Sequence, residues 1–134
     1  MTNKIVALLP MKANSERVKG KNFKILNDKP LFKWILDTLL SIKIIDKIVI
    51  NTDARIMLED NGLSSNDRIV IRDRKIELIG DLVSMNSIIS DDINNIDSDI
   101  YLMTHTTNPF LSSKSIVDAL NLFQKKKNYL ENHK

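Results

Sequence analysis

The fold is decided by residues 5–22, IVALLPMKANSERVKGKN, where a short apolar run changes abruptly into a polar loop. The five apolar residues from Ile5 to Leu9 are too few for a buried helix and suit a central strand of a parallel sheet. Pro10 ends this strand, because proline has no N–H to donate to a sheet ladder. The segment therefore predicts a buried strand with a long loop at its carboxyl end.

The loop of residues 11–22 is cationic. It holds four basic residues and one acid, a net charge of +3: Lys12, Arg17, Lys19 and Lys21 against Glu16. Ligands of open α/β sheets bind at the carboxyl ends of the strands, where lysine charges and exposed backbone N–H groups can hold a triphosphate. A solvated basic connector is the alternative. The loop matches neither the P-loop nor the dinucleotide fingerprint, since Gly20 is its one glycine and no Gly-Lys-Ser/Thr ends it.

Composition indicates one globular domain. The chain has 134 residues, of which 43% are apolar and 28% charged, and this length can bury a real core. There is no cysteine, which excludes a disulfide framework and a thiolate metal site. No apolar run approaches the roughly 18 residues of a membrane span, so we expect a cytoplasmic protein with no membrane partner.

The positive charge is concentrated near the start of the chain. Residues 1–33 carry eight Lys/Arg and two acids. Because the chain has few aromatic residues, this basic segment suits a nucleotide better than a nucleic acid.

The rest of the chain alternates strand and helix patterns. Further strands are predicted at 46–51, 68–72 and 99–103, and helices at 30–42, 54–61, 84–96 and from Ser112 or Ser113 to Lys125–Lys127. A short extended piece at 23–26 and a turn at 27–30 precede the first helix. This alternation predicts an α/β fold, a parallel sheet of about four strands with helices on both faces. The inward faces of the helices are expected to carry Leu31, Ile35 and Leu39; Ile88, Ile89, Ile93 and Ile96; and Ile116, Leu120 and Phe123.

Three residues near strand ends have structural interpretations. Asp53 comes directly before a helical run and is expected to cap it, with Gly62 closing the other end. On the residues alone, Arg74 is expected at the surface. His105 follows the fourth strand, where a structural and a functional role are equally open.

The amino-acid sequence of the loop resembles that of the acylneuraminate cytidylyltransferases, the CMP-sialic acid synthetases. The segment PMKANSERVKGKN is similar to their signature loop: Lys12 stands where the common pattern has arginine, Glu16 stands where many members have lysine, and Ser15, Arg17, Gly20, Lys21 and Asn22 match directly. The resemblance continues in DRKIELIGD, with Arg74, Glu77, Leu78 and Asp81 in register, and in THTTNP at 104–109, where one branch of the family has Thr-His-x-Thr-Asn-Pro.

This resemblance implies a Rossmann-like nucleotidyltransferase fold and transfer of CMP from CTP to a sialic-acid-type sugar. The roles it implies are these: Lys21 as the catalytic phosphate contact; Lys12, Ser15, Arg17, Asn22, Arg74, Ser84 and Asn86 as nucleotide-binding residues; His105 and Thr107 as residues facing the sugar. Capping of the helix at 84–96 explains Ser84 equally well.

The resemblance covers the front half of the family pattern only. The second half of that pattern carries the dimerisation arm and the Asp-x-Asp carboxylates for Mg²⁺, so residues 1–134 are expected to be one nucleotide-binding domain that is incomplete at its C-terminus, with unknown metal ligands. A truncated product, a frameshifted gene and one half of a split enzyme remain open, and self-association is expected. Alternative functions are a cytidylyltransferase for another ulosonic acid and a non-catalytic nucleotide-binding remnant.

Overall fold

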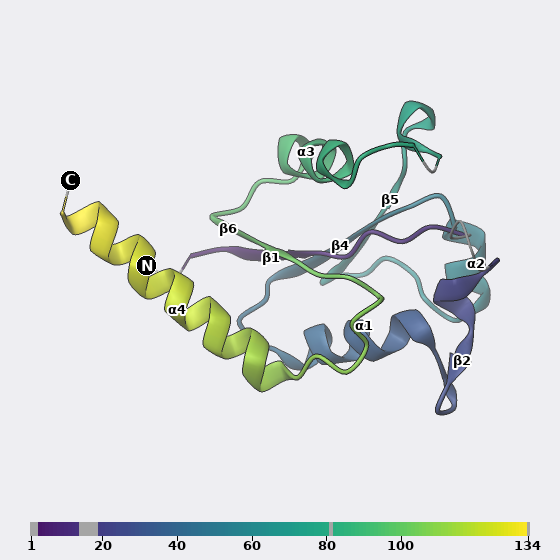
Figure 1. Ribbon diagram of the computed structural model, residues 1–134, viewed down its shortest axis with the longest axis horizontal. Helices are drawn as coiled ribbons and strands as arrows, with labels where there is room; N and C mark the ends of the chain where they lie inside the picture. The colour runs from purple at the N-terminus through teal and green to yellow at the C-terminus, as the bar shows by residue number, and fades with distance from the viewer. Residues whose placement is uncertain (1–2, 14–18, 81, 134) are drawn as a thin grey trace.

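A four-stranded parallel sheet forms the centre of the computed structural model, which describes residues 3–13, 19–80 and 82–133 (Figure 1). The strand order is β5-β4-β1-β6, with all three pairings parallel. The strands are β1 (Ile5–Leu8), β4 (Lys47–Thr52), β5 (Ile69–Asp73) and β6 (Ile100–Met103). The four predicted strands are confirmed, each within two residues of its expected bounds.

Helices cover both faces of this sheet, as predicted. They are α1 (Leu31–Ser41), α2 (Arg55–Asp60), α3 (Met85–Asn95) and α4 (Ser113–Asn132), with short 3₁₀ turns η1 (Lys21–Phe23) and η2 (Ile76–Leu78). Figure 1 shows α3 on one face and α1 with α4 on the other. No helix in the described ranges is long and apolar enough to cross a membrane.

Alternation along β1 supplies both cores, because successive strand side chains point to opposite faces of a sheet. Ile5, Ala7 and Leu9 belong to the larger core, which α1 and α4 complete. Val6 and Leu8 face the smaller core on the α3 side. Burying one aliphatic side chain of this kind stabilises a fold by about 1.5–3 kcal/mol, so β1 anchors the loop that follows it.

A tight hairpin precedes α1. Its strands are β2 (Ile25–Leu26) and β3 (Lys29–Pro30), and both turn residues, Asn27 and Asp28, have positive φ angles of 48° and 72°. Two successive residues with positive φ are typical of a type I′ turn, which Asn and Asp tolerate. The Trp34 Nε1–H donates to the Leu26 carbonyl oxygen over 2.8 Å and fixes the hairpin to α1.

Two of the expected inward positions, one on α1 and one on α3, are corrected. Leu31 is only half-buried, and α1 buries Phe32 instead. Ile93 is 42% exposed, because α3 turns Asp91 and Asp92 toward the sheet instead, where they meet Arg72.

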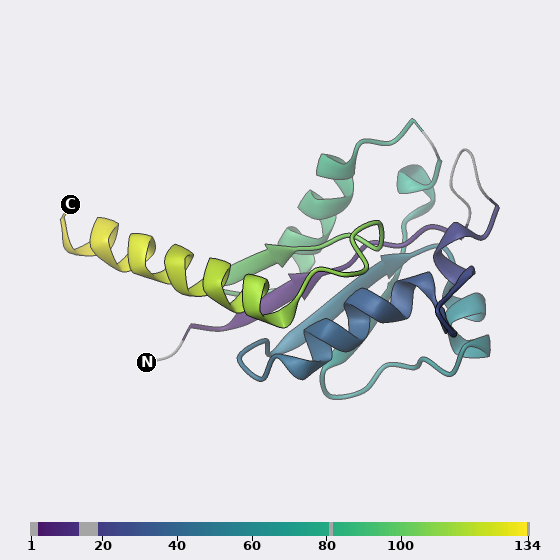
Figure 2. The ribbon, with the colours of Figure 1, turned by 60° about the horizontal axis from the view of Figure 1, so that its bottom comes forward.

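The end of α4 was also predicted wrongly. The helix does not end near Lys125–Lys127 but continues to Asn132, with an ion pair of 3.3 Å between Lys127 Nζ and Glu131 Oε1. Figures 1 and 2 show its last turns extending beyond the edge of the sheet. Phe123 is therefore 53% exposed, whereas Ile116 and Leu120 are buried as predicted.

Candidate functional site

The start of the cationic loop is fixed to the carboxyl end of β4. The Met11 N–H donates to the Asn51 carbonyl oxygen over 3.0 Å, and the Ala13 N–H donates to Asp53 Oδ1 over 2.7 Å. The prediction that Asp53 caps α2 is wrong, because its carboxylate accepts from the loop. The N–H of Ala54 is satisfied by the Thr52 hydroxyl instead, over 2.9 Å. Gly62 follows α2 with a φ of 83°, as predicted for its end.

The far end of the loop is closed by Asn22. Gly20 adopts a left-handed conformation with a φ of 65°, and η1 begins at the next residue. Asn22 Nδ2 donates to the Lys12 carbonyl oxygen over 2.9 Å, and the Thr106 hydroxyl donates to Asn22 Oδ1 over 2.6 Å. The far end of the loop is thereby attached both to the start of the loop and to the segment after β6. Sequence reasoning did not single out Thr106, which is 7% exposed.

Three of the loop's cations belong to the described residues. Lys12 and Lys21 are half-buried at the two ends of the loop, whereas Lys19 is exposed. Ser15 and Arg17, which the sequence assigned to the nucleotide, lie outside the described residues. The contribution of Lys12 and Lys21 to phosphate binding stays a prediction.

Arg74 is buried, not at the surface. The residue is 6% exposed, and within the described residues both side-chain hydrogen bonds go to Asn51: Nε donates to Oδ1 and Nη2 to the carbonyl oxygen, each over 2.9 Å. Burial lowers the pKa of the Arg74 guanidinium, while the charges of Asp53 and Asp92 oppose that shift. The surface expectation failed because Arg74 folds back against the end of β4 when its own N–H joins the Thr52 carbonyl oxygen over 2.8 Å.

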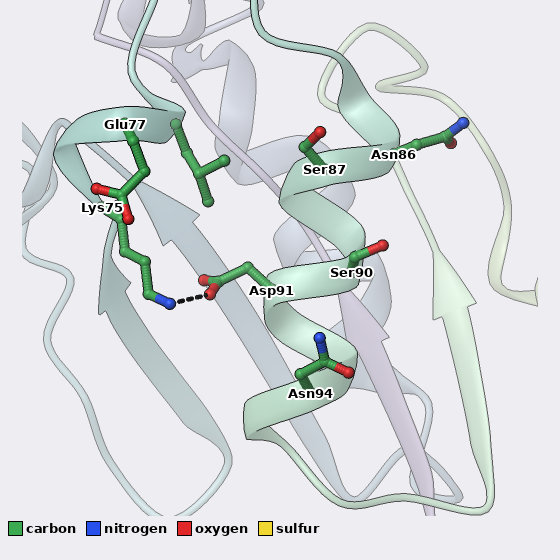
Figure 3. A pocket seen from close by; sticks show the side chains of 8 residues that line it. Lys75, Glu77, Asn86, Ser87, Ser90, Asp91 and Asn94 are labelled. Carbon is green, nitrogen blue, oxygen red and sulfur yellow. Dashed lines mark ion pairs between the residues drawn. The ribbon is translucent and has the colours of Figure 1, made fainter.

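Two neighbouring aspartates of α3 complete a charged cluster. Asp92 is 1% exposed, accepts from Asn51 Nδ2 over 2.9 Å and pairs with Arg72. Asp91 pairs with Arg72 over 3.1 Å, and it pairs with Lys75 over 2.9 Å, as Figure 3 shows. The hydrogen bond from Lys75 holds the pKa of Asp91 below its ordinary value, whereas burial raises the pKa of Asp92.

The burial of these two aspartates was not predicted from the sequence. Asp91 and Asp92 interrupt the apolar pattern that runs through Ile88, Ile89 and Ile93, and a solvent-exposed position was the simplest interpretation of that interruption. Their only signal was the presence of Arg72 in a neighbouring strand pattern, since buried carboxylates require a cationic partner.

A hollow of about 420 Å³ opens beside the loop. Ala13, Asp53 and Arg74 line it together with the apolar side chains of Met57 and Ile79. Apolar walls with a few convergent polar groups are typical of small-molecule sites. The hollow therefore joins the start of the cationic loop to Arg74, two features that are 61 positions apart by residue number.

Ser84 and Asn86 lie elsewhere. Ser84 is the N-cap of α3, where its Oγ accepts from the Ser87 N–H over 3.2 Å, so the capping interpretation is confirmed. Asn86 lines a second hollow of about 440 Å³ between η2 and α3, with Lys75 and Asp91 on its walls (Figure 3). The structure does not gather these two residues with Arg74 in the first hollow.

The segment after β6 alternates between buried and exposed residues. Thr104 and Thr106 are buried, and their hydroxyls donate to the Leu8 carbonyl oxygen and to Asn22 Oδ1, over 2.9 and 2.6 Å. His105 and Thr107, the residues expected to face a sugar, are both exposed. The two threonines thus hold the segment while its other side chains remain accessible at the edge where the strands end.

The described residues do not form a metal site of the expected kind. Across residues 3–13, 19–80 and 82–133, no group of three or more His, Cys, Asp or Glu side chains is arranged to hold a metal ion. Mg²⁺ binds through carboxylates together with substrate phosphates. Asp92 is engaged by Arg72 and Asn51, and Asp53 accepts from the Ala13 N–H through Oδ1, so the described residues show no paired carboxylates arranged for the Mg²⁺ that the sequence resemblance implies.

Comparison with known proteins places this geometry in a family. The family model for cytidylyltransferases matches residues 6–134. The chain is 25% identical over 130 residues to the N-acylneuraminate cytidylyltransferase of Escherichia coli O18:K1:H7 (strain RS218 / NMEC), covering 96% of this chain and 30% of that protein. It is also 25% identical over 122 residues to the 3-deoxy-manno-octulosonate cytidylyltransferase of Christiangramia forsetii (strain DSM 17595 / CGMCC 1.15422 / KT0803), covering 91% of this chain and 46% of that protein. The chain therefore spans less than half the length of these curated relatives.

Solved structures share the fold. CMP:2-keto-3-deoxy-manno-octonic acid synthetase, solved in complex with CTP, superposes with a TM-score of 0.73 at 16% identity, over 91% of this chain and 48% of that one. The bifunctional IspDF from Campylobacter jejuni gives a TM-score of 0.68 at 17% identity, over 91% and 31%. These similarities confirm the Rossmann-like nucleotidyltransferase fold. Because the family match extends over nearly all of its residues, the chain belongs to the cytidylyltransferase family.

Proposed function

We propose that this chain binds CTP, with the triphosphate on the loop of residues 11–22, and serves the transfer of CMP to a sugar acid. Family membership supports cytidylyltransferase chemistry, and the two curated relatives are named for acylneuraminate and for 3-deoxy-manno-octulosonate. Their identities to this chain are both 25%. The signature loop favours the sialic-acid-type sugar, and another ulosonic acid is the alternative.

The observation that carries the proposal is the attachment of the cationic loop at both ends. Asp53 holds the Ala13 N–H at one end, and Asn22 with Thr106 closes the other. The two described ends of the loop, which carry Lys12 and Lys21, are thereby held in place before a ligand binds, and this lowers the ordering cost of binding at those ends. In the described part of the chain the Lys21 side chain has no ion-pair partner, so its charge is available to a phosphate.

The chemistry proposed is an in-line displacement. The anomeric hydroxyl oxygen of the sugar acid attacks the α-phosphorus of CTP and loses its proton to solvent, the bond between the α-phosphorus and the oxygen that bridges to the β-phosphorus breaks, and pyrophosphate leaves with that electron pair. Lys12 and Lys21 would neutralise phosphate charge, and Ser15 and Arg17 are assigned to the same loop by their match to the family pattern. Asn22 and Arg74 would contact the nucleoside, and His105 and Thr107 the sugar. Positioning and electrostatic stabilisation account for most catalysis of phosphoryl transfer.

A calorimetric titration with CTP, ATP and GTP tests the nucleotide part of the proposal. We expect binding of CTP in preference to both purine nucleotides. Equal binding of all three, or no binding, would contradict it. A second assay, release of pyrophosphate from CTP with N-acetylneuraminate or 3-deoxy-manno-octulosonate, distinguishes the two sugars and separates an active enzyme from a non-catalytic nucleotide-binding chain.

A further inference from the structure

Three buried polar side chains are bonded in series beside the proposed nucleotide site. Asp92 of α3, Asn51 of β4 and Arg74 after β5 are 1%, 0% and 6% exposed. Asn51 Nδ2 donates to Asp92 Oδ1 over 2.9 Å, and Arg74 Nε donates to Asn51 Oδ1 over 2.9 Å. The series joins three elements that the sequence separates by 18 to 41 positions.

The order of donors and acceptors fixes the orientation of Asn51. An ionised carboxylate can only accept hydrogen bonds, so Asp92 requires the Nδ2 end of the Asn51 amide to face it. The Oδ1 end then faces Arg74, whose Nε–H it accepts. Arg74 Nη2 completes a two-bond contact with the Asn51 backbone carbonyl oxygen over 2.9 Å. Asp92 thereby determines which way the guanidinium is held without touching it.

The negative charges of Asp91 and Asp92 do not explain why Arg74 is buried beside them. Asp91 and Asp92 are already paired with two cations, Arg72 and Lys75. Arg74 forms no ion pair with any described carboxylate, although it is almost inaccessible to solvent. A buried guanidinium with no directly paired carboxylate is unfavourable for stability, and such costs are typical of functional sites.

The remaining nitrogen of Arg74 is the one that a ligand can reach. Nη1 makes no hydrogen bond within the described residues, and it is not among their buried unpaired atoms. Arg74 lines the hollow of about 420 Å³, together with Ala13 and Asp53. With Nε and Nη2 held by Asn51, the geometry leaves Nη1 to meet an acceptor or an anionic group in that hollow.

We propose that Asp92, acting through Asn51, is a positioning residue that holds the Arg74 guanidinium against the wall of this hollow. The part of this inference that concerns ligand binding rests on the proposed function, in which Arg74 contacts the nucleoside of CTP. The positioning itself concerns only the protein and is measurable without any ligand.

The test follows the Arg74 Nε–H by ¹⁵N nuclear magnetic resonance in the wild-type chain and in Asp92→Asn. An asparagine at 92 can itself donate, which allows the Asn51 amide to reverse, so we expect exchange of the Arg74 Nε–H with solvent to rise about tenfold or more, as for loss of one buried hydrogen bond. CTP binding, measured by calorimetry, should weaken about tenfold, because the Arg74 guanidinium is no longer held in one orientation. The matched control is Arg72→Lys, which alters the ion pairs of the same aspartates through a side chain that bonds neither Asn51 nor Arg74, and it should leave both quantities within about twofold of wild type.

A second variant at the same position, Asp92→Ser, keeps the inference testable if Asp92→Asn folds poorly. Its small hydroxyl can donate as well as accept, so it cannot hold the Asn51 amide in one orientation, and exchange of the Arg74 Nε–H should rise as in Asp92→Asn. Arg74→Lys retains the charge but cannot bond both atoms of Asn51, so it should weaken CTP binding by a similar factor, and adding Asp92→Asn should cause no further loss. Unchanged exchange of the Arg74 Nε–H in Asp92→Asn, or an equal change in Arg72→Lys, would overturn the inference. A wild-type chain that shows the expected exchange but binds no CTP would confirm the positioning and overturn the proposed function.

Discussion

Lys21 is the residue on which phosphate binding depends most directly. It begins η1, just after the left-handed Gly20, and lies half-buried where the loop closes. Removing one charge-assisted phosphate contact costs about 1.5–3 kcal/mol, or roughly 10- to 100-fold in affinity. Lys21→Ala should therefore weaken CTP binding by that factor in calorimetry and leave the circular dichroism spectrum intact. Lys19→Ala, at an exposed position outside the family pattern, is the control and should cost much less; an unchanged dissociation constant for Lys21→Ala would show that the loop is only a basic connector.

Asp91 makes the stability of the fold depend on pH. Its pKa in the folded protein is lowered, first by the hydrogen bond from Lys75 and further by Arg72, so it stabilises the fold above its ordinary pKa of about 3.9 and loses that contribution as the pH falls through the folded value. Asp92 has the opposite sign, because burial raises its pKa and its ionisation weakens the fold as the pH rises. Asp91→Asn should lower the free energy of unfolding at pH 7 by about 1–3 kcal/mol, a difference that shrinks below about pH 4.

Urea denaturation at pH 7 and pH 3 measures this difference. Asp118→Asn, in the exposed pair with Lys114, is the control and should have no measurable effect, because exposed pairs contribute little. A destabilisation by Asp91→Asn that is equal at both pH values would contradict the assignment of the lowered pKa to Asp91.

At the scale of elements, the contact between Thr106 and Asn22 links the loop after β1 to the segment after β6. Thr106→Val keeps the shape of the side chain but removes the hydroxyl that donates a hydrogen bond to Asn22 Oδ1. Loss of this bond should free the far end of the loop and weaken CTP binding severalfold, with about 0.5–1.5 kcal/mol lost from the free energy of unfolding. Thr104→Val is the matched control, because its buried hydroxyl bonds the Leu8 carbonyl oxygen and not the loop. If the two variants bind CTP equally well, the contact has no role in the site.

The elements could be predicted from the sequence because their signals are local. The apolar runs predicted the strands, and the two residues with left-handed backbone conformation, Asn27 and Asp28, lie within the predicted turn. The partners of site residues could not be predicted in this way, since they are distant in sequence: Asp53 bonds Ala13, 40 positions away, and Thr106 bonds Asn22, 84 positions away. The burial of Arg74 and of Asp92 was not predicted for the same reason, because a charged residue is assigned to the surface unless its buried partner is known.

For the whole molecule, the projecting end of α4 is the feature most open to association. Its exposed apolar side chains are Leu122, Phe123, Tyr129 and Leu130, at 60%, 53%, 61% and 64%, on a segment that extends past the sheet (Figures 1 and 2). Contiguous exposed apolar surface promotes association. We expect concentration-dependent self-association in analytical ultracentrifugation, reduced in the double variant Leu122→Glu with Leu130→Glu. A wild-type chain that stays monomeric at all concentrations would contradict this.

The central claim is that CTP binds at the carboxyl ends of the strands, on the loop of residues 11–22. Its most direct test is a titration of the ¹⁵N-labelled chain with CTP, followed through the backbone amide resonances. We expect the largest shifts in that loop, smaller ones at Arg74 and in the segment 104–107, and much weaker shifts with ATP at the same concentrations. Saturable CTP binding that leaves the amides of residues 11–22 unperturbed would contradict the account.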